Sequence, residues 1–327
     1  MKASIIDELN IGMIGAGRIA KFHLVALASV GLNVSNIAAS RGSSNVHKFA
    51  EDNNIANVWN DPREMISKAK CDALVILTPT EPTLELLKLA MGFKVPILVE
   101  KPIAHNSRDF EKLDLSRNDV MVGYNRRFYP AVQDLKKTIS GCSYVSLKVE
   151  IPESILGDEL NKRSKFYPVF QNSVHMLDLV QYLVGELNLE SRLESQTASP
   201  LSSISGLLST KTGHTVNLLL NFNAPANFSL TVDAAESRYI LCPVEEISHF
   251  RGMSVSEPTN DRPFRTYSPK LISRTRSDSR ESTIKPGFYL QALAFKNLIN
   301  KIPDSNFATL LTSYNLMKLV EQILDVK

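Results

Sequence analysis

Two glycines near the start of the chain, one residue apart, stand between an apolar run and a helical pattern. They belong to Gly15-Ala16-Gly17-Arg18-Ile19-Ala20, which fits the pattern G-x-G-x-x-G/A. In this pattern the first glycine allows a tight turn, the second lets backbone approach a pyrophosphate, and the last small residue keeps the helix close to the sheet. The helix N-terminus then favours phosphate. A turn that serves only packing is the alternative, but the strand–turn–helix context favours a dinucleotide, with contacts from Gly15, Gly17, Arg18 and Ile19.

The residues after the second apolar run bear on which dinucleotide binds. An acidic side chain there would bind the ribose 2′-hydroxyl and indicate NAD. The chain has Ala39-Ser40-Arg41-Gly42-Ser43-Ser44 instead, with no carboxylate before Glu51. Arg41 with the neighbouring serines suits a 2′-phosphate, so we expect cofactor contacts from Ser40, Arg41 and Ser43 and favour NADP. Arg41 stacked on the adenine would be compatible with either NADP or NAD.

These side chains need a scaffold that brings strand ends together, and the first third of the chain predicts one. Short apolar runs alternate with helical patterns, and the run 72–77 is continuously apolar after its first residue, as in buried parallel strands. Such alternation predicts an α/β domain with a doubly wound parallel sheet. Strands are predicted at 11–14, 34–40, 72–77, 96–99 and 119–123, and helices at 19–28, 46–52, 83–91 and 107–115.

The pattern changes after residue 123, where we place a domain boundary. Residues 1–123 are predicted to form a dinucleotide-binding Rossmann domain, and 124–327 a substrate-binding and oligomerisation α+β domain. In the second part, alternating apolar residues at 216–220 suit an antiparallel sheet, and residues 251–285 suggest a long polar excursion. The two closing helices are able to pack back on the first domain. Further helices are predicted at 130–139, 172–184, 288–299 and 308–324, and strands at 144–151, 204–208, 216–220 and 228–232.

Composition narrows the class of protein. The chain has 327 residues, 43% hydrophobic and 22% charged, which is typical of a folded protein of two domains. A net charge of +3 does not suggest nucleic acid as a partner, and no apolar run is long enough for a membrane span. Three distant cysteines have no spacing for zinc or a disulfide framework. We therefore expect a cytoplasmic protein without a metal site.

Several motifs, taken in order, resemble one oxidoreductase family. The glycine turn is followed by His23, then by Thr78-Pro79, and then by Glu100-Lys101-Pro102. Two later segments, Tyr124-Asn125-Arg126-Arg127-Phe128 and Ser173-Val174-His175-Met176-Leu177-Asp178, also match. Across essentially its whole length the chain resembles the glucose–fructose oxidoreductase, inositol dehydrogenase and rhizopine catabolism protein family, usually written Gfo/Idh/MocA.

The resemblance carries expectations for fold, site and assembly. It implies a Rossmann domain followed by a domain with a large, mainly antiparallel open sheet, which often forms a homodimer or homotetramer interface. It implies that Lys101 lies beside the nicotinamide and the substrate, with a Lys101–Pro102 bond that is often cis in relatives. It assigns cofactor contacts to Thr78, Pro79, Glu100 and Lys101, and substrate contacts to Asn125, Arg126, Gln171 and His175.

Oxidation of an alcohol requires removal of the hydroxyl proton as hydride leaves, and a lysine can take it once its pKa is lowered. Lys101 is the expected base, assisted by His175, which can titrate near neutral pH. Glu100 would oppose the lowered pKa, so we expect it to face elsewhere or to orient the site. In relatives an Asp lies four residues before this histidine, on the same helix face. Here that position is Gln171, which cannot accept a proton.

Five cations are expected near the mouth of the substrate cleft, where they would hold a carboxylate or nucleotide-sugar phosphates, or remain solvated surface charge. They are Arg126, Arg127, Lys162, Arg163 and Lys165.

Three functions follow from these patterns. The leading hypothesis is an NAD(P)-dependent dehydrogenase or reductase of a sugar, polyol or nucleotide sugar. The alternatives are a reductase of a non-sugar carbonyl or unsaturated compound, and a catalytically silent NAD(P)-binding sensor.

Overall fold

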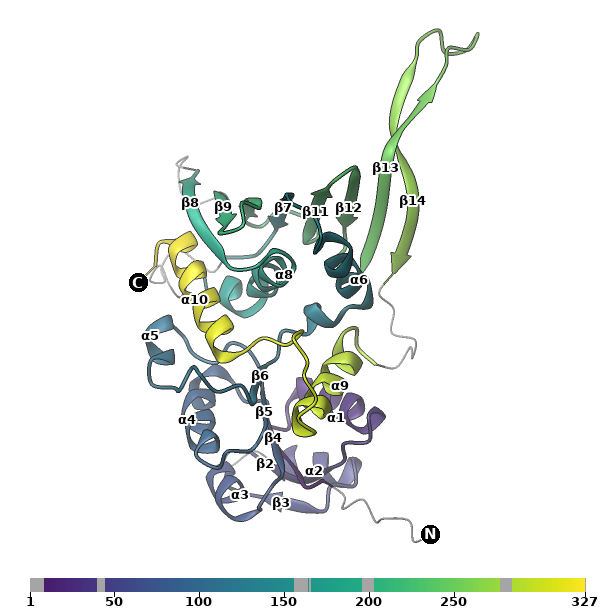
Figure 1. Cartoon of the computed structure of the whole chain (residues 1–327). Helices are drawn as coiled ribbons and strands as arrows, with labels where there is room; N and C mark the ends of the chain where they lie inside the picture. Colours follow the sequence, from purple (N-terminus) through teal and green to yellow (C-terminus); the bar gives the residue numbers. More distant parts are fainter. Residues whose placement is uncertain are drawn as a thin grey trace, which may run out of the picture. The chain divides into compact units, whose positions relative to one another are not determined.

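The computed structural model describes residues 9–39, 45–155, 164, 166–195, 203–276 and 284–326, and they form two compact units (Figure 1). The first unit comprises Met1–Phe128 and Ser279–Lys318, and the second comprises Tyr129–Asp278 and Leu319–Lys327. The first unit extends to Phe128, five residues beyond the sequence-based division at residue 123. It also includes Ser279–Lys318, in line with the expectation that the closing helices pack back on the first domain.

The first unit contains a six-stranded parallel sheet in the order β3-β2-β1-β4-β5-β6. Strands β1, β4, β5 and β6 are buried along their whole length because helices cover both faces. This order confirms the predicted doubly wound Rossmann fold. The strands are β1 (Ile11–Ile14), β2 (Val34–Ala38), β3 (Asn57–Trp59), β4 (Ala73–Ile76), β5 (Ile97–Val99) and β6 (Val120–Val122).

The helices of the first unit divide between the two faces of this sheet. Helices α1, α2 and α9 lie on one face and α3 and α4 on the other (Figure 1). Helix α3 and strand β3 are absent from the predicted elements, because both are short and polar. Helix α3 begins after Asp61, whose carboxylate accepts the Arg63 N–H at 2.8 Å. The bounds are α1 (Arg18–Ser29), α2 (Asn45–Asp52), α3 (Pro62–Lys68), α4 (Thr80–Met91), α5 (Ser107–Phe110), the 3₁₀ turn η1 (Asn125–Phe128) and α9 (Phe288–Ile299).

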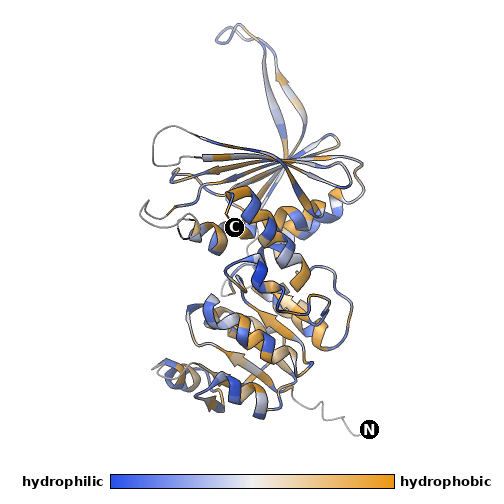
Figure 2. Cartoon of the chain, turned by 90° about the vertical axis from the view of Figure 1, so that its left-hand side faces the viewer, coloured by the Kyte–Doolittle hydropathy of each residue, from blue (hydrophilic) through white to orange (hydrophobic). Residues whose placement is uncertain are grey.

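The second unit contains an eight-stranded sheet in the order β14-β13-β12-β11-β7-β10-β9-β8. All neighbours are antiparallel except β7 and β10, which confirms the expected large, mainly antiparallel sheet. One face is covered by α6 and α8, as Figure 2 shows. The helices are α6 (Pro130–Ile139), the π-helical turn η2 (Val169–Ser173) and α8 (Val174–Val184). Helix α10 (Leu310–Leu324) begins in the first unit and ends in the second, since the division falls after Lys318. The strands are β7 (Val145–Ile151), β8 (Leu187–Glu194), β9 (Ser203–Thr210), β10 (Thr215–Asn221), β11 (Ser229–Ala234), β12 (Ser237–Leu241), β13 (Glu246–Ser256) and β14 (Thr266–Arg276).

Part of the expected polar excursion over 251–285 is regular structure. Residues 251–256 belong to β13 and residues 266–276 to β14, which pair as an antiparallel ribbon, and residues 277–283 lie outside the described part. Alternating serine, threonine and larger apolar residues favour strands even in a hydrophilic segment, because such side chains fit a pleated surface. Among the described residues, no helix is both long and apolar enough to cross a membrane.

Candidate functional site

The glycine turn after β1 uses its two glycines differently. Gly15 has φ +112°, and a Cβ placed on it would lie 2.6 Å from the Leu77 carbonyl oxygen. Its N–H donates to the Ala38 oxygen at 2.8 Å, which ties the turn to β2. Gly17 immediately precedes α1, and a Cβ there would meet no protein atom within 4 Å. Gly15 is therefore required by the fold, whereas the space in front of Gly17 is open to a ligand.

A cavity of about 620 Å³ lies in front of this turn. It occupies the point where β1 is flanked by β2 on one side and β4 on the other, the switch point at which doubly wound sheets bind dinucleotides. No side chain caps the N-terminus of α1, so its first N–H groups are available to phosphate. The residues present therefore fit a dinucleotide. The cavity is lined by Gly15, Ala16, Gly17, Ala39, Asn45, Asn60, Asp61, Pro62, Arg63, Leu77, Thr78, Pro79, Glu81, Pro82, Glu85 and Leu86.

The predicted cofactor contacts are distributed unevenly around this cavity. Thr78 and Pro79 line it, and their loop is held by Thr83, whose hydroxyl lies 2.7 Å from Thr78 Oγ1 and donates to the Pro79 oxygen at 2.8 Å. Arg18 is exposed on the first turn of α1, and Ile19 is partly buried. Ser40, Arg41 and Ser43 lie outside the described residues. Arg63 and three carboxylates in the lining were not singled out from the sequence.

The residues after β5 form a connected polar group at the same edge of the sheet. Glu100 Oε1 lies 2.8 Å from Nε2 of the buried His23 of α1, and Oε2 accepts the Lys101 N–H at 3.2 Å. A Cβ on Gly123 would lie 3.0 Å from the Glu100 carboxylate, so this glycine makes room for it. Burial raises the pKa of Glu100, but the hydrogen bond and charge of His23, together with Lys101, hold that pKa below its usual value. The Lys101–Pro102 bond is cis, as the family resemblance led us to expect.

Lys101 has the electrostatic surroundings that a proton-accepting amine requires. Burial lowers the pKa of Lys101, and the positive charges of Arg126 and Lys285 lower it further, against the opposing carboxylate of Glu100. Lys285 comes from the segment before α9, far away in sequence, and nothing in the sequence marked it. Its ammonium lies 5.2 Å from the ring centres of both Phe22 and Phe288.

Asn125 and Arg126 follow β6, the strand next to β5. Asn125 is buried in η1, and its Nδ2 donates to the Pro286 oxygen at 3.1 Å. This bond fixes the segment that carries Lys285 to the turn that carries Arg126. Asn125 was expected to contact substrate, and the structure assigns its Nδ2 this additional role. Arg127 is buried, so it is no solvated surface charge, and Lys162, Arg163 and Lys165 lie outside the described residues.

In the second unit, His175 lies in the first turn of α8 and is 9% exposed. Gln171 precedes it in η2, a π-helical turn, and its Nε2 donates to the Tyr167 hydroxyl at 2.7 Å. The predicted helix over 172–184 is therefore α-helical only from Val174. Because a π-helix is wound more loosely than an α-helix, the i, i+4 relation expected between Gln171 and His175 does not apply unchanged.

A buried carboxylate next to this turn was missed from the sequence. Glu153 Oε2 accepts from Ser173 Oγ at 2.7 Å and from Asn172 Nδ2 at 3.0 Å, and Oε1 accepts the Ser154 N–H at 3.1 Å. Glu153 thereby fixes the end of η2 immediately before His175. It follows β7 in a segment without a motif, and only its contacts reveal it.

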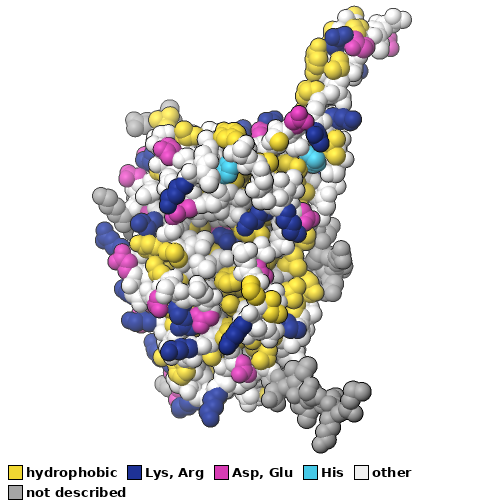
Figure 3. Space-filling view, viewed as in Figure 1, with side chains coloured by type: hydrophobic (Ala, Val, Ile, Leu, Met, Phe, Trp, Pro, Cys, Tyr) yellow, Lys and Arg dark blue, Asp and Glu magenta, His cyan; other side chains and the backbone are white. Residues whose placement is uncertain are grey.

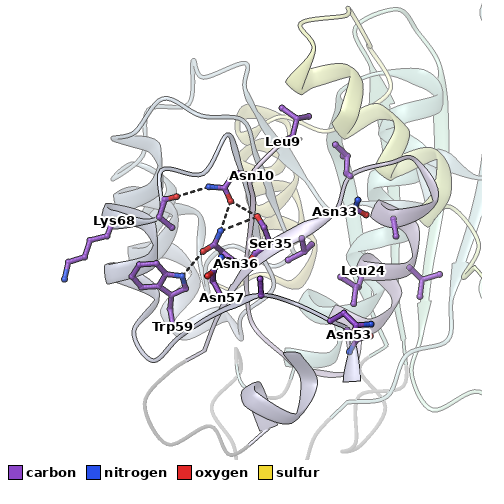
Figure 4. A pocket seen from close by; sticks show the side chains of 17 residues that line it. Leu9, Asn10, Leu24, Asn33, Ser35, Asn36, Asn53, Asn57, Trp59 and Lys68 are labelled. Atoms are coloured by element: carbon purple, nitrogen blue, oxygen red, sulfur yellow. Dashed lines mark hydrogen bonds between the residues drawn. The ribbon is translucent and has the colours of Figure 1, made fainter. Parts of the chain in front are cut away.

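A second cavity of the first unit, about 1010 Å³, lies at the opposite, N-terminal ends of the strands (Figure 4). Its polar side chains bond mainly to one another. Asn10 Oδ1 accepts from Ser35 Oγ and from Asn36 Nδ2, both at 2.6 Å, and Asn36 Oδ1 accepts from Trp59 Nε1 at 2.9 Å. We interpret this network as a tie between the segment before β1 and strands β2 and β3.

Comparisons with known proteins agree with this geometry. Residues 9–123 match the model of the Gfo/Idh/MocA family, described as an oxidoreductase family with an NAD-binding Rossmann fold. The chain is 26% identical over 191 residues to the uncharacterized oxidoreductase YrbE of Bacillus subtilis, with 54% of each chain covered. It is 23% identical over 187 residues to the myo-inositol 2-dehydrogenase of Thermotoga maritima, with 54% of this chain and 55% of the relative covered. These matches span about half the length of the curated relatives.

Solved structures resemble the chain over nearly its whole length. A levoglucosan dehydrogenase in complex with NADH and levoglucosan has a TM-score of 0.73 at 18% identity, covering 97% of this chain and 96% of that one. The UDP-N-acetylglucosamine 3-dehydrogenase GnnA from Acidithiobacillus ferrooxidans has a TM-score of 0.71 at 14% identity, covering 97% of both. At these identities the likeness establishes the fold. The family resemblance noted in the motifs is confirmed by the model match: residues 9–123 are a Rossmann domain of the Gfo/Idh/MocA oxidoreductase family.

Proposed function

We propose that the chain is an NAD(P)-dependent dehydrogenase or reductase that transfers hydride to or from the hydroxyl-bearing carbon of a sugar, polyol or nucleotide sugar. The observation that carries this proposal is the position of Lys101. It follows β5, at the same edge of the sheet as the dinucleotide cavity, with a pKa lowered by burial, Arg126 and Lys285. A lysine whose pKa is lowered is better able than a surface lysine to accept the proton that hydride chemistry releases.

The proposed roles follow from the contacts of each side chain. The bound nicotinamide would exchange hydride with the substrate carbon, while Lys101 takes the hydroxyl proton during oxidation and returns it during reduction. Arg126 and Lys285 favour the uncharged amine that this requires. Glu100, held by His23, positions the backbone of Lys101 through its N–H.

The second unit is proposed to bind the substrate. His175 would contact the reacting hydroxyl, and Gln171 would offer hydrogen bonds to a neighbouring hydroxyl. Glu153 holds the turn between them, through Asn172 and Ser173. A hydroxyl-rich ring suits such side chains, because each hydroxyl both donates and accepts. The names of relatives support this class: they are inositol dehydrogenases, a levoglucosan dehydrogenase and a UDP-N-acetylglucosamine dehydrogenase.

We further propose NADP as the preferred cofactor. The support is the lack of a carboxylate between the end of β2 and Glu51, the presence of Arg41 there, and Arg63 in the described lining of the cavity. Of the carboxylates in that lining, Asp61 is engaged in capping α3, and Glu81 Oε1 lies 3.5 Å from His105 Nε2. If Arg41→Ala weakens NADP and NAD equally, the 2′-phosphate role is wrong.

The experiment that tests the function combines binding and turnover. NADPH fluorescence is measured on mixing with the protein, and the complex is then assayed on a panel of sugars, polyols and nucleotide sugars. Binding with turnover of at least one of them supports the proposal. Binding without turnover, also with non-sugar carbonyl and unsaturated compounds, would indicate a silent NAD(P)-binding protein and overturn it.

A further inference from the structure

Lys285, in the segment before α9, is held in place by contacts of its backbone and of its side chain. Phe288 N–H donates to the Lys285 oxygen at 3.1 Å, and Asn125 Nδ2 donates to the oxygen of the next residue, Pro286, at 3.1 Å. The Lys285 ammonium lies 5.2 Å from the ring centres of both Phe22 and Phe288. The backbone bonds and the two rings together define where this cation lies.

A series of short contacts leads from Lys285 to Lys101. The ring centre of Phe288 lies 4.8 Å from that of His23, and His23 Nε2 lies 2.8 Å from Glu100 Oε1. Glu100 directly precedes Lys101 and accepts its N–H. Lys285 therefore lies in the neighbourhood of the amine that is proposed to take the substrate's proton, although the two lysines are far apart in sequence.

Arg126 adds a further cation to this neighbourhood. It follows Asn125, whose side chain donates to the backbone next to Lys285, so the two segments that carry Arg126 and Lys285 lie side by side. The charges of both act on Lys101. Three basic side chains are thus gathered around one carboxylate, that of Glu100.

No acidic side chain neutralises Lys285 in the described part of the chain. Elsewhere in the first unit basic side chains have acidic partners, as Lys68 has in Glu64 at 3.3 Å, and Figure 3 shows Lys and Arg interspersed with Asp and Glu. The carboxylate of Glu100 is engaged with His23 and with a backbone N–H. Because Lys285 is also exposed, its ammonium is open to a negative charge that a ligand brings.

These cations are separate from the cavity proposed for the dinucleotide. The described lining of that cavity includes Arg63 but neither Lys285 nor Arg126. The phosphates of a dinucleotide are expected at the glycine turn and at the N-terminus of α1, on that cavity. An anion beside Lys101 is therefore better explained as part of the substrate than as part of the cofactor.

We propose that Lys285, together with Arg126, holds an anionic group, a carboxylate or a phosphate, that the substrate carries close to its reacting hydroxyl. This inference rests on the proposed function and narrows its substrate class to sugar acids, sugar phosphates and nucleotide sugars. A guanidinium offers a planar fork to such a group, and an ammonium adds a compact charge for a further oxygen. An uncharged sugar offers neither cation an ionic hydrogen bond.

The test compares ligands that differ in charge. Glucuronate, its uncharged methyl ester and glucose form one series, glucose 6-phosphate and UDP-glucose supply phosphate, and the galactose counterparts are included. Calorimetric titration into the NADPH-bound protein measures binding alone, because a reduced cofactor cannot oxidise a hydroxyl. We expect an anionic ligand to bind roughly 10-fold or more tightly than its uncharged counterpart. The comparison of carboxylate with phosphate then identifies which anion is bound.

Three variants assign this preference to Lys285. Lys285→Gln should reduce the preference for the anionic ligand by roughly 10-fold, and Lys285→Arg should retain it because the charge is kept. Lys318→Gln is the matched control, since Lys318 also lies near an aromatic ring, 5.3 Å from the centre of Tyr314, but is not among the charges that act on Lys101. NADPH affinity and melting temperature should stay near wild type in all three, because both lysines are exposed.

The inference is overturned if the wild type binds the uncharged ligands as tightly as the anionic ones, or if Lys285→Gln keeps the preference. It is also overturned if Lys285→Gln weakens NADPH binding, since this cation would then serve a cofactor phosphate. Turnover with NADP or NAD is measured separately on the same ligands. Turnover of uncharged sugars alone would leave the proposed function intact and overturn this inference, whereas selective binding of anions without any turnover would support the inference and overturn the proposed function.

Discussion

Substitution at Gly15 and at Gly17 is expected to damage two different properties of the protein, although one residue separates them. At Gly15 a Cβ would meet the Leu77 carbonyl oxygen at 2.6 Å, and the φ of +112° is unfavourable for other residues. We expect Gly15→Ala to lower the free energy of unfolding by on the order of 3 kcal/mol, from backbone strain and displacement of β4's end. At roughly 2–4 °C per kcal/mol, the melting temperature falls by about 6–12 °C.

At Gly17 a Cβ meets no protein atom within 4 Å, and the φ of −80° is ordinary. Gly17→Val should therefore change stability by no more than about 0.5 kcal/mol. It should nevertheless occupy the space through which the backbone approaches a pyrophosphate. A loss of two hydrogen bonds to phosphate oxygens, each about 1.5 kcal/mol, corresponds to a dissociation constant raised by roughly 100-fold.

Calorimetric titration with NADPH and thermal unfolding of both variants separate the two effects, with Gly17→Ala as an intermediate. The reasoning is refuted if Gly17→Val binds dinucleotide as tightly as the wild type. It is also refuted if Gly17→Val unfolds as early as Gly15→Ala, since that would make both glycines requirements of the fold alone.

Three further predictions concern Lys101 and the hydrogen-bond network of Asn10, Ser35, Asn36 and Trp59 at the N-terminal ends of the strands. Lys101→Met should lower turnover by roughly 10²–10⁴ while NADPH affinity and melting temperature stay near wild type; wild-type turnover of a verified substrate would contradict the mechanism. Lys285→Gln removes a positive charge that lowers the pKa of Lys101. The pKa of Lys101 therefore rises, and the ascending limb of the oxidation rate moves to higher pH. Glu100→Gln removes a negative charge that raises the pKa of Lys101, so it should move this limb to lower pH. The measurement is the pH profile of the oxidation rate for each variant. If the ascending limb moves in the same direction for both variants, neither charge acts through Lys101. Asn36→Ala leaves Trp59 Nε1 without its acceptor and should lower the free energy of unfolding by about 2 kcal/mol. Urea unfolding measures this loss. An unchanged urea midpoint would mean that the network contributes no stability.

Much of the cofactor-binding half could be predicted because its signals are local. The glycine turn, the apolar strands and the helices between them depend on residues adjacent in sequence, and the structure has the predicted doubly wound parallel sheet. The short elements β3 and α3 and the π-turn η2 escaped prediction, since segments of three to seven residues carry no clear periodicity. The antiparallel ribbon of β13 and β14 was also missed, because its many arginines and serines concealed the alternation of its strands.

The sequence of residues 9–123 is enough to predict the family, the glycine turn and the lysine expected to carry the proton. Each of these predictions depends on a short motif and on the strand or helix next to it. Only the tertiary structure brings the charge of Lys285 close enough to act on Lys101. It also places the His23 ring within hydrogen-bond distance of Glu100. In the second unit it lets Glu153 accept a hydrogen bond from Ser173, at the end of the turn before His175. Only strand pairing revealed that Met253 lies opposite Pro269 and Val255 opposite Tyr267. The physical reason is the same in each case. Backbone preference and periodicity are properties of neighbours in sequence, whereas the pKa of a lysine and the exposure of a strand face depend on which distant segments fold beside them.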